Sequence, residues 1–177
     1  PATGRRRQCP PATARGSRFA LVQENLYADP TVQLFTNLDM VKGPSLELVR
    51  RCLDTFARLH ASHHGLSERQ RDAILPMSRH LFLTEPMKSI SHSLNAQALQ
   101  PCIKKLPGVI PDELVAAYKN SIENWDLLLV RWFSGPLMLI HGDSHLGNFF
   151  VDGDNMGMLD WQAVHWGKGV RDVQYFL

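Results

Sequence analysis

Apolar residues recur at intervals of three or four in two long stretches of the chain, as they do in amphipathic helices. The first stretch covers about residues 45–63 and begins with Ser45, a residue type that can cap a helix N-terminus. The second begins at Pro111 and ends before Gly135, which a proline follows. Its apolar stripe consists of Leu114, Tyr118, Ile122, Trp125, Leu129 and Trp132. We predict one long helix here, with a stripe that lies in the core and supports the segment after it.

Three further stretches carry helical signals. Ser67 and Gln70 have the spacing of a capping box and predict that a helix starts there. A helix over residues 87–99 is expected between flanking prolines, and another begins at Arg171. Together with the two long stretches, these signals indicate a mainly helical chain.

Some side chains at the predicted helix ends need an interpretation of their own. His60 and His64 lie one turn apart, and we interpret them as helix-end histidines, which the helix dipole favours. Val173, Tyr175 and Phe176 lie in the last predicted helix, with little after them to pack on. We expect these three to form an exposed apolar patch.

Between these helical stretches, residues 136–162 alternate short apolar runs with polar clusters. The runs over residues 137–140 and 149–151 read as strands. Residues 152–157 are dense in turn formers, so Met158 and Leu159 should return as the partner strand of a hairpin. The predicted fold class is therefore α+β, mainly helical, with a small β-hairpin.

Polar side chains gather where these strands stop. His141, Asp143, His145 and Asn148 lie in the loop between the first two strands, and Asp160 follows the return strand. The hairpin should thus bring the oxygen-bearing side chains of Asp143, Asn148 and Asp160 to one end of a small sheet. Turn chemistry alone gives no reason for Asp160 to return there.

The spacing of these residues resembles that of a known enzyme family. His141, Asp143 and Asn148 are spaced as in the H-R-D-x-x-x-x-N motif of protein kinases, and Asp160 stands where their D-F-G aspartate lies. H-G-D-S-H-L-G-N followed by M-L-D-W-Q resembles the aminoglycoside phosphotransferase and choline-kinase-like small-molecule kinases, most of all their ecdysteroid-kinase-like branch. The resemblance implies a protein-kinase-like C-terminal lobe, and a kinase that uses ATP and Mg²⁺ to phosphorylate a hydroxyl of a small-molecule alcohol.

The resemblance also implies a role for each polar residue. Asp143 would accept or orient the hydroxyl proton, and Asn148 and Asp160 would hold Mg²⁺. His141 and His145 would support and position the loop. Asp172 would hold the loop through backbone hydrogen bonds. Nucleotide binding would fall to the link between lobes, which consists of Gln23, Glu24, Asn25 and Leu26 after a strand over residues 19–22.

Two alternatives remain open at this stage. His141, Asp143 and His145 alternate like metal ligands, with His165 downstream, which would suit a metal-dependent hydrolase. That interpretation leaves Asn148 unexplained. The second alternative is a catalytically incompetent fragment or pseudokinase that binds only metal or a partner. It arises because neither a Gly-rich strand pair nor a nucleotide lysine can be placed before residue 19. We expect residues 1–18 to be a disordered basic tail or fragment edge, and residues 19–177 a partial domain truncated at both ends.

Composition limits the possible partners and the compartment. The net charge is +2, yet residues 1–18 hold five arginines and no acid, so the rest carries 14 basic and 17 acidic side chains. A nucleic-acid-binding domain keeps its basic charge on the folded part, so we expect no nucleic-acid partner. No apolar run is long enough to span a membrane. The three cysteines are far apart and odd in number, which favours a reducing, cytoplasmic location.

Overall fold

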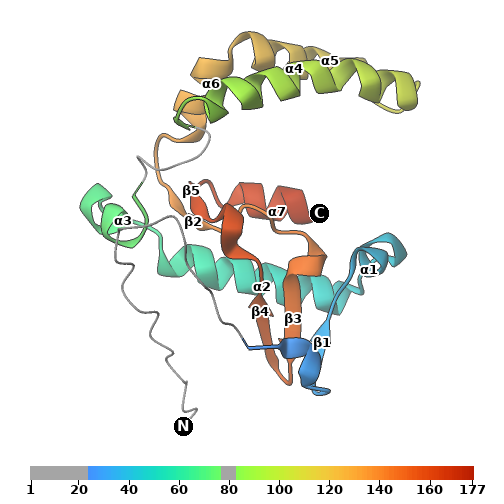
Figure 1. Cartoon of the computed structure of the whole chain (residues 1–177), viewed down its shortest axis with the longest axis vertical. Helices are drawn as coiled ribbons and strands as arrows, with labels where there is room; N and C mark the ends of the chain where they lie inside the picture. Colours follow the sequence, from blue (N-terminus) through green and yellow to red (C-terminus); the bar gives the residue numbers. More distant parts are fainter. Residues whose placement is uncertain (1–23, 77–82) are drawn as a thin grey trace.

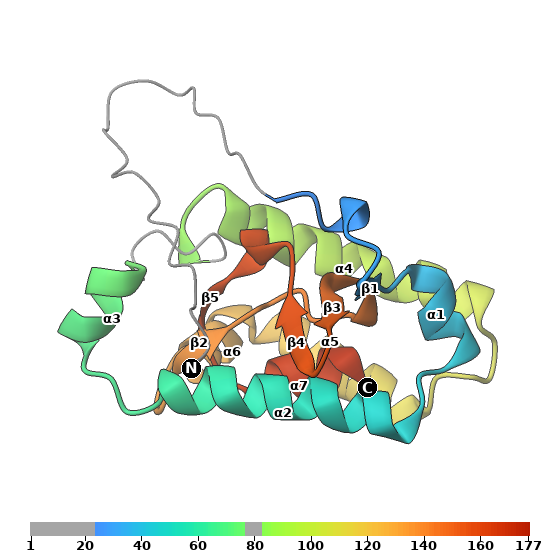
Figure 2. The ribbon, with the colours of Figure 1, turned by 90° about the horizontal axis from the view of Figure 1, so that it is seen from below.

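The computed structural model describes residues 24–76 and 83–177. In chain order these ranges contain the 3₁₀ turn η1 (Leu26–Ala28), strand β1 (Val32–Leu34), helices α1 (Asn37–Lys42), α2 (Leu46–Ser62), α3 (Glu68–Ile74), α4 (Met87–Lys105), α5 (Asp112–Glu123) and α6 (Trp125–Trp132), strand β2 (Met138–Ile140), η4 (Leu146–Asn148), strands β3 (Phe149–Asp152) and β4 (Asn155–Met158), η5 (Trp161–Ala163), β5 (His165–Gly167) and α7 (Val170–Phe176). Helices α4, α5 and α6 lie together on one side, and α2 runs beside the strands on the other (Figures 1 and 2). Within the described ranges, no helix has both the length and the apolar character needed to cross a bilayer.

The predicted hairpin forms with a shorter turn than expected, because β4 already begins at Asn155 and ends before Leu159. The strands belong to two antiparallel sheets. One sheet has the order β1-β3-β4, and Phe149 faces Met158 across the hairpin. The other pairs β2 with β5, with Ile140 opposite His165. Asn148 precedes β3 and Asp160 follows β4, so both lie at the same end of the three-stranded sheet, whereas the strand before Asp143 belongs to the other sheet. The loop of residues 141–148 connects the two sheets.

Helix α2 supplies the core beneath the hairpin. Ser45 caps it as predicted, accepting a hydrogen bond from the Leu48 N–H at 3.2 Å. The Phe56 ring packs edge-on against Phe149 and Phe176, with centroids 5.3 and 5.8 Å away. Such aromatic pairs add about 0.5–1.5 kcal/mol to the stabilisation from area burial alone.

The C-terminal helix contributes more to this core than its sequence position suggests. Phe176 is buried and Val173 packs against the same cluster, because α7 lies alongside α2. The prediction that both form an exposed patch is therefore wrong, whereas Tyr175 is exposed.

Two of the other helix predictions need correction. Helix α4 extends past residue 99 and through Pro101, because hydrogen bonding resumes beyond the proline: Leu106 N–H donates to the Cys102 carbonyl at 3.0 Å. The single helix expected after Pro111 is two helices, α5 and α6, that meet at Asn124. Pro111 lies at the cap of α5, one place before its first helical residue.

The stripe on α5 and α6 does not form the core that was predicted. Leu129 is buried, but Leu114 is 58% exposed and the other stripe residues are only half-buried. The reason is tertiary: α5 packs on α4, away from the sheets (Figure 1). Helix α2 packs on strands of both sheets, since it contacts β2 and β4.

Strand β5 is tied to α3 by one buried indole. Trp166 is fully buried, and its Nε1–H donates to the Leu75 carbonyl at 2.7 Å.

We expect Trp166→Phe to lower the free energy of unfolding in urea by about 1–3 kcal/mol, because the carbonyl loses its partner and a cavity remains. The control is Trp161→Phe. This indole also donates to a carbonyl, that of Met158 at 3.1 Å, but it is 40% exposed, so water can replace the bond and the cost should be less than about 1 kcal/mol. Equal losses in the two variants would contradict this account of Trp166.

Candidate functional site

His141 connects the two sheets through its backbone and its ring. Strand β2 ends one residue earlier, and the His141 side chain is fully buried. Its Nε2 contacts the Leu159 carbonyl at 2.7 Å, at the end of the hairpin, and its Nδ1 accepts from the Asp143 N–H at 3.3 Å. Since a carbonyl can only accept, Nε2 carries the proton. His141 thus fixes the loop to the hairpin.

Asp172, in the first turn of α7, lies under the same loop. Its side chain is fully buried, and its two carboxylate oxygens accept the backbone N–H groups of His141 at 2.8 Å and Gly142 at 2.9 Å. His60 Nε2 lies 3.0 Å from Oδ2, and the Ser144 hydroxyl donates to the Asp172 carbonyl at 2.8 Å. Asp172 thus binds two backbone N–H groups of the loop, and its support of a catalytic loop stays a prediction.

The ionisation of Asp172 follows from those donors. Burial raises the pKa of the carboxyl, but the hydrogen bonds from His60, Gly142 and His141 lower it by more, so the pKa lies below its usual value. Asp172 is therefore a buried carboxylate at neutral pH.

Glycine is the only residue type that fits at position 142. Its φ is +83°, and an added Cβ would lie 2.3 Å from the Ala163 carbonyl oxygen. Arg171 also donates to the Gly142 carbonyl at 3.2 Å. The backbone between His141 and Asp143 is therefore held on several sides, which limits where the Asp143 carboxylate can lie.

Asp143, His145 and Asn148 come together in this loop. The Asn148 Nδ2 donates to the Asp143 backbone carbonyl at 2.7 Å and to its Oδ2 at 3.3 Å. His145 Nε2 lies 3.8 Å from the same carboxylate oxygen. Asp143 is 28% exposed, so its carboxylate can be reached from solvent. The amide orientation of Asn148 leaves its Oδ1 as the atom that can accept from, or ligate, another group.

Asp160 follows the hairpin in a strained conformation. It is the one non-glycine residue in the described ranges with a positive φ, at φ 55° and ψ 64°. Its neighbour Leu159 donates to the Asn148 carbonyl at 2.8 Å, so the Asp160 backbone is tied to the loop. A left-handed residue costs about 1–2 kcal/mol, which the surrounding hydrogen bonds must offset. The exposed carboxylate accepts from Gln162 Nε2 at 3.3 Å.

The donor set in this loop suits a hard cation better than zinc. Asn148 Oδ1 and the Asp160 carboxylate offer the few oxygen ligands that Mg²⁺ takes from proteins. For zinc, both ring nitrogens of His141 are already used, and His165 Nδ1 contacts the Ala163 carbonyl at 2.7 Å. Among residues 24–76 and 83–177, no three His, Cys, Asp or Glu side chains form a metal-binding group. The alternative zinc-type ligand set of His141, Asp143 and His145 is therefore not formed.

The predicted nucleotide-binding link is only partly visible. Gln23, the strand predicted over residues 19–22 and the basic segment 1–18 lie outside the described residues. Glu24 is exposed, and Asn25 caps η1 by accepting from the Tyr27 N–H at 3.2 Å. Leu26 begins η1, which leads towards β1.

Sequence reasoning missed two residues that support the loop. The first is His60, which we expected to be a helix-end histidine but which contacts Asp172. The second is Ser144, which is fully buried. Both residues contact Asp172, which lies 112 positions from His60 and 28 from Ser144. A local sequence pattern carries no signal for contacts over such distances in the chain.

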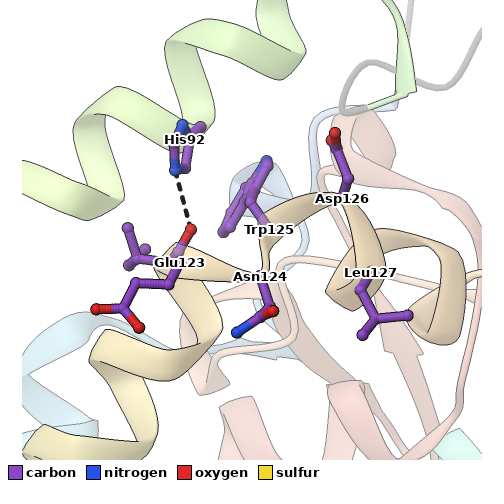
Figure 3. Close-up of a pocket in the computed structure, with 7 residues that line it drawn as sticks. His92, Glu123, Asn124, Trp125, Asp126 and Leu127 are labelled. Atoms are coloured by element: carbon purple, nitrogen blue, oxygen red, sulfur yellow. Dashed lines mark hydrogen bonds between the residues drawn. The ribbon is translucent and has the colours of Figure 1, made fainter.

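A separate hollow of about 380 Å³ lies where α5 meets α6, facing α4 (Figure 3). It is lined by His92, Ile122, Glu123, Asn124, Trp125, Asp126 and Leu127. His92 Nε2 lies 3.1 Å from the Ile122 carbonyl, and Lys88 pairs with Asp126 at 2.6 Å. None of the residues predicted from the sequence for the site lies in this hollow.

One comparison with known proteins gives a family for the chain. Residues 33–177 match the model of the phosphotransferase enzyme family (APH). Comparisons with curated proteins and with solved structures gave no match. The match includes both sheets except for Val32, the loop of residues 141–148, Asp160 and Asp172. The chain belongs to the phosphotransferase enzyme family.

Proposed function

We propose that this protein transfers the terminal phosphoryl group of ATP to a hydroxyl of a small-molecule alcohol, with Mg²⁺ as cofactor. The observation that carries the proposal is the joined loop and hairpin. Asn148 donates to Asp143, and the residue before Asp160 donates to Asn148. Phosphoryl transfer depends mainly on positioning and on charge stabilisation, and this arrangement holds three oxygen-bearing side chains on a fixed backbone.

Asp143 is the proposed catalytic residue. Its carboxylate is partly exposed and is contacted by Asn148 and His145, so it has a defined orientation and still reaches solvent. In the proposed reaction it orients the acceptor hydroxyl and takes its proton as the oxygen attacks phosphorus. His141 and His145 keep the loop in place and take no part in the proton transfer from the acceptor hydroxyl.

Asn148 and Asp160 are the residues proposed to hold Mg²⁺. The Asn148 amide is fixed by its two hydrogen bonds to Asp143, which leaves Oδ1 for the ion. The Asp160 carboxylate is exposed and next in sequence to Leu159, which is bonded to Asn148. When bound, Mg²⁺ would neutralise charge on the phosphate oxygens of the nucleotide.

The proposed acceptor class is a small-molecule alcohol, with aminoglycosides, choline and ecdysteroids as the first candidates. The test is to incubate the chain with ATP, Mg²⁺ and one compound of each class, and to follow ADP release and the phosphorylated product by ³¹P NMR. Transfer that stops when EDTA removes Mg²⁺ would support the proposal. ATP turnover that persists in EDTA would contradict the role given to the ion.

The role of Asn148 leads to a metal-specific prediction. We expect Asn148→Ala to raise the Mg²⁺ concentration needed for half-maximal activity by about 10- to 100-fold, because one of two protein ligands is lost and Asp143 loses its partner. The matched control is Asn155→Ala at the exposed start of β4, which should leave the Mg²⁺ requirement unchanged. The measurement is initial rate against free Mg²⁺. An Asn148 variant with an unchanged Mg²⁺ curve would remove this residue from the metal site.

A further inference from the structure

The ring of His60 is held in one place near the end of α2. Its side chain is 13% exposed, and it stacks on Phe56 from the preceding turn, with centroids 6.0 Å apart and planes 9° apart. On another side it meets the start of α7: a Cβ added at Gly169 would lie 2.6 Å from His60 Nδ1. These contacts fix the orientation of the ring, so Nε2 points towards Asp172. It lies 3.0 Å from Oδ2 of that carboxylate.

This contact is shared with the catalytic loop. Asp172 Oδ2 accepts from both His60 and the His141 N–H, and Oδ1 accepts from the Gly142 N–H. Because a carboxylate only accepts, His60 must supply the proton from Nε2. A carboxylate held from the α2 side cannot rotate freely, so the position of His60 limits where the backbone of residues 141–142 can lie.

We infer that His60 is a positioning residue for this loop. It acts through Asp172 on the backbone that carries Asp143, and it does not touch the reacting groups. The role depends on hydrogen bonding and not on packing alone, because a ring of the same size without the Nε2 donor would leave Asp172 Oδ2 with one donor fewer. Its kinetic consequence rests on the proposed function, but its structural consequence does not.

The structural test is amide hydrogen exchange of the whole chain, followed residue by residue by NMR. The informative pair is His60→Phe, which keeps a ring but loses the donor, and His60→Gln, whose amide can donate from near the Nε2 position. We expect exchange at His141 and Gly142 to be at least about tenfold faster in His60→Phe than in the wild type, beyond any change in the β3–β4 hairpin. The His60→Gln variant should lie within about threefold of the wild type.

The matched control lies one turn further along the chain. His64→Phe alters an exposed histidine and should leave the exchange at both loop amides unchanged. If the His60→Phe variant does not fold, the experiment uses His60→Asn instead. The asparagine side chain is too short to reach Asp172 Oδ2, and its polar amide can be hydrated in the space that the ring leaves. The inference is overturned if exchange rises equally throughout the fold, if the two loop amides do not respond, or if His60→Gln is as impaired as His60→Phe.

The kinetic test separates this inference from the proposed function. In an active preparation, the donor-free variant should lower kcat by about 10- to 100-fold with little change in KM for ATP, as expected for misplacement of a catalytic group. Rescue by His60→Gln would support positioning through the hydrogen bond, and an unchanged kcat in the donor-free variant would overturn it. If the wild-type chain transfers no phosphate, the proposed function fails, and the exchange data alone decide the role of His60.

Discussion

Replacing Asp143 by asparagine should lower kcat by about 10²–10⁴-fold while the fold remains intact. The amide keeps the shape of the side chain and can still contact Asn148, but it cannot accept a proton from the attacking hydroxyl. Because Asp143 is 28% exposed, the substitution leaves no buried charge unpaired, and the free energy of unfolding should change little. The measurement is steady-state phosphate transfer at saturating ATP and Mg²⁺, together with a urea melt.

A control for this substitution lies on the same hairpin. Asp152→Asn changes an exposed carboxylate at the end of β3 and should leave kcat within about twofold. If Asp143→Asn retained the full rate, the assignment of Asp143 as the catalytic residue would be wrong. The metal-binding and positioning assignments would then need a different reacting centre.

Replacing Asp172 by asparagine should have the largest effect on stability, a loss of about 3–5 kcal/mol in the free energy of unfolding. The fully buried carboxylate accepts from three N–H groups at 2.8–3.0 Å. An amide can present its oxygen to only one side, so its own NH₂ group must face a donor. The measurement is urea unfolding at neutral pH, with loss of loop-amide protection as a second readout.

The matched control is another first-turn acid. Asp112→Asn at the exposed start of α5 removes only an interaction with the helix dipole and should cost about 0.3–1 kcal/mol. A similar small loss for Asp172→Asn would show that Asp172 is an ordinary first-turn acid as well.

The Asp172 contribution should also depend on pH. Its hydrogen bonds hold the pKa below the ordinary value of 3.8. In the unfolded chain the group binds its proton more readily, so the stabilisation is fully present above about pH 3.8 and is lost as the pH falls through the folded-state pKa. The stability difference between the wild type and Asp172→Asn should therefore be constant near neutrality and shrink in acid. A difference that persisted below the folded-state pKa would contradict this account.

Local patterns were sufficient to predict the hairpin and two helix N-termini. Apolar alternation and a run of turn formers predicted a hairpin after Phe149. It forms as β3 and β4, but its turn is Gly153 and Asp154 rather than the whole of residues 152–157. The cap at Ser45 and the capping box of Ser67 and Gln70 are also present. These features depend on interactions within a few residues, so a single sequence carries their signal.

Local patterns were misleading where packing decided the outcome. The apolar stripe from Leu114 to Trp132 indicated one core helix. Instead the helix ends at Asn124 and a second one begins, and α5 packs on α4, which leaves Leu114 exposed. Periodicity shows that a helix has an apolar face, but not which surface will cover it. For the same reason, Phe176 could not be placed against Phe56 in advance.

The amino-acid pattern was therefore enough to place Asp143, Asn148 and Asp160 around one hairpin, since a turn sets the register of its own strands. Only the folded chain decided how that loop is held. His60 comes from α2, Asp172 from α7, and β2 pairs with β5 rather than with the hairpin. Contacts between positions so far apart depend on how helices and sheets pack, and nothing in a short stretch of residues encodes that packing.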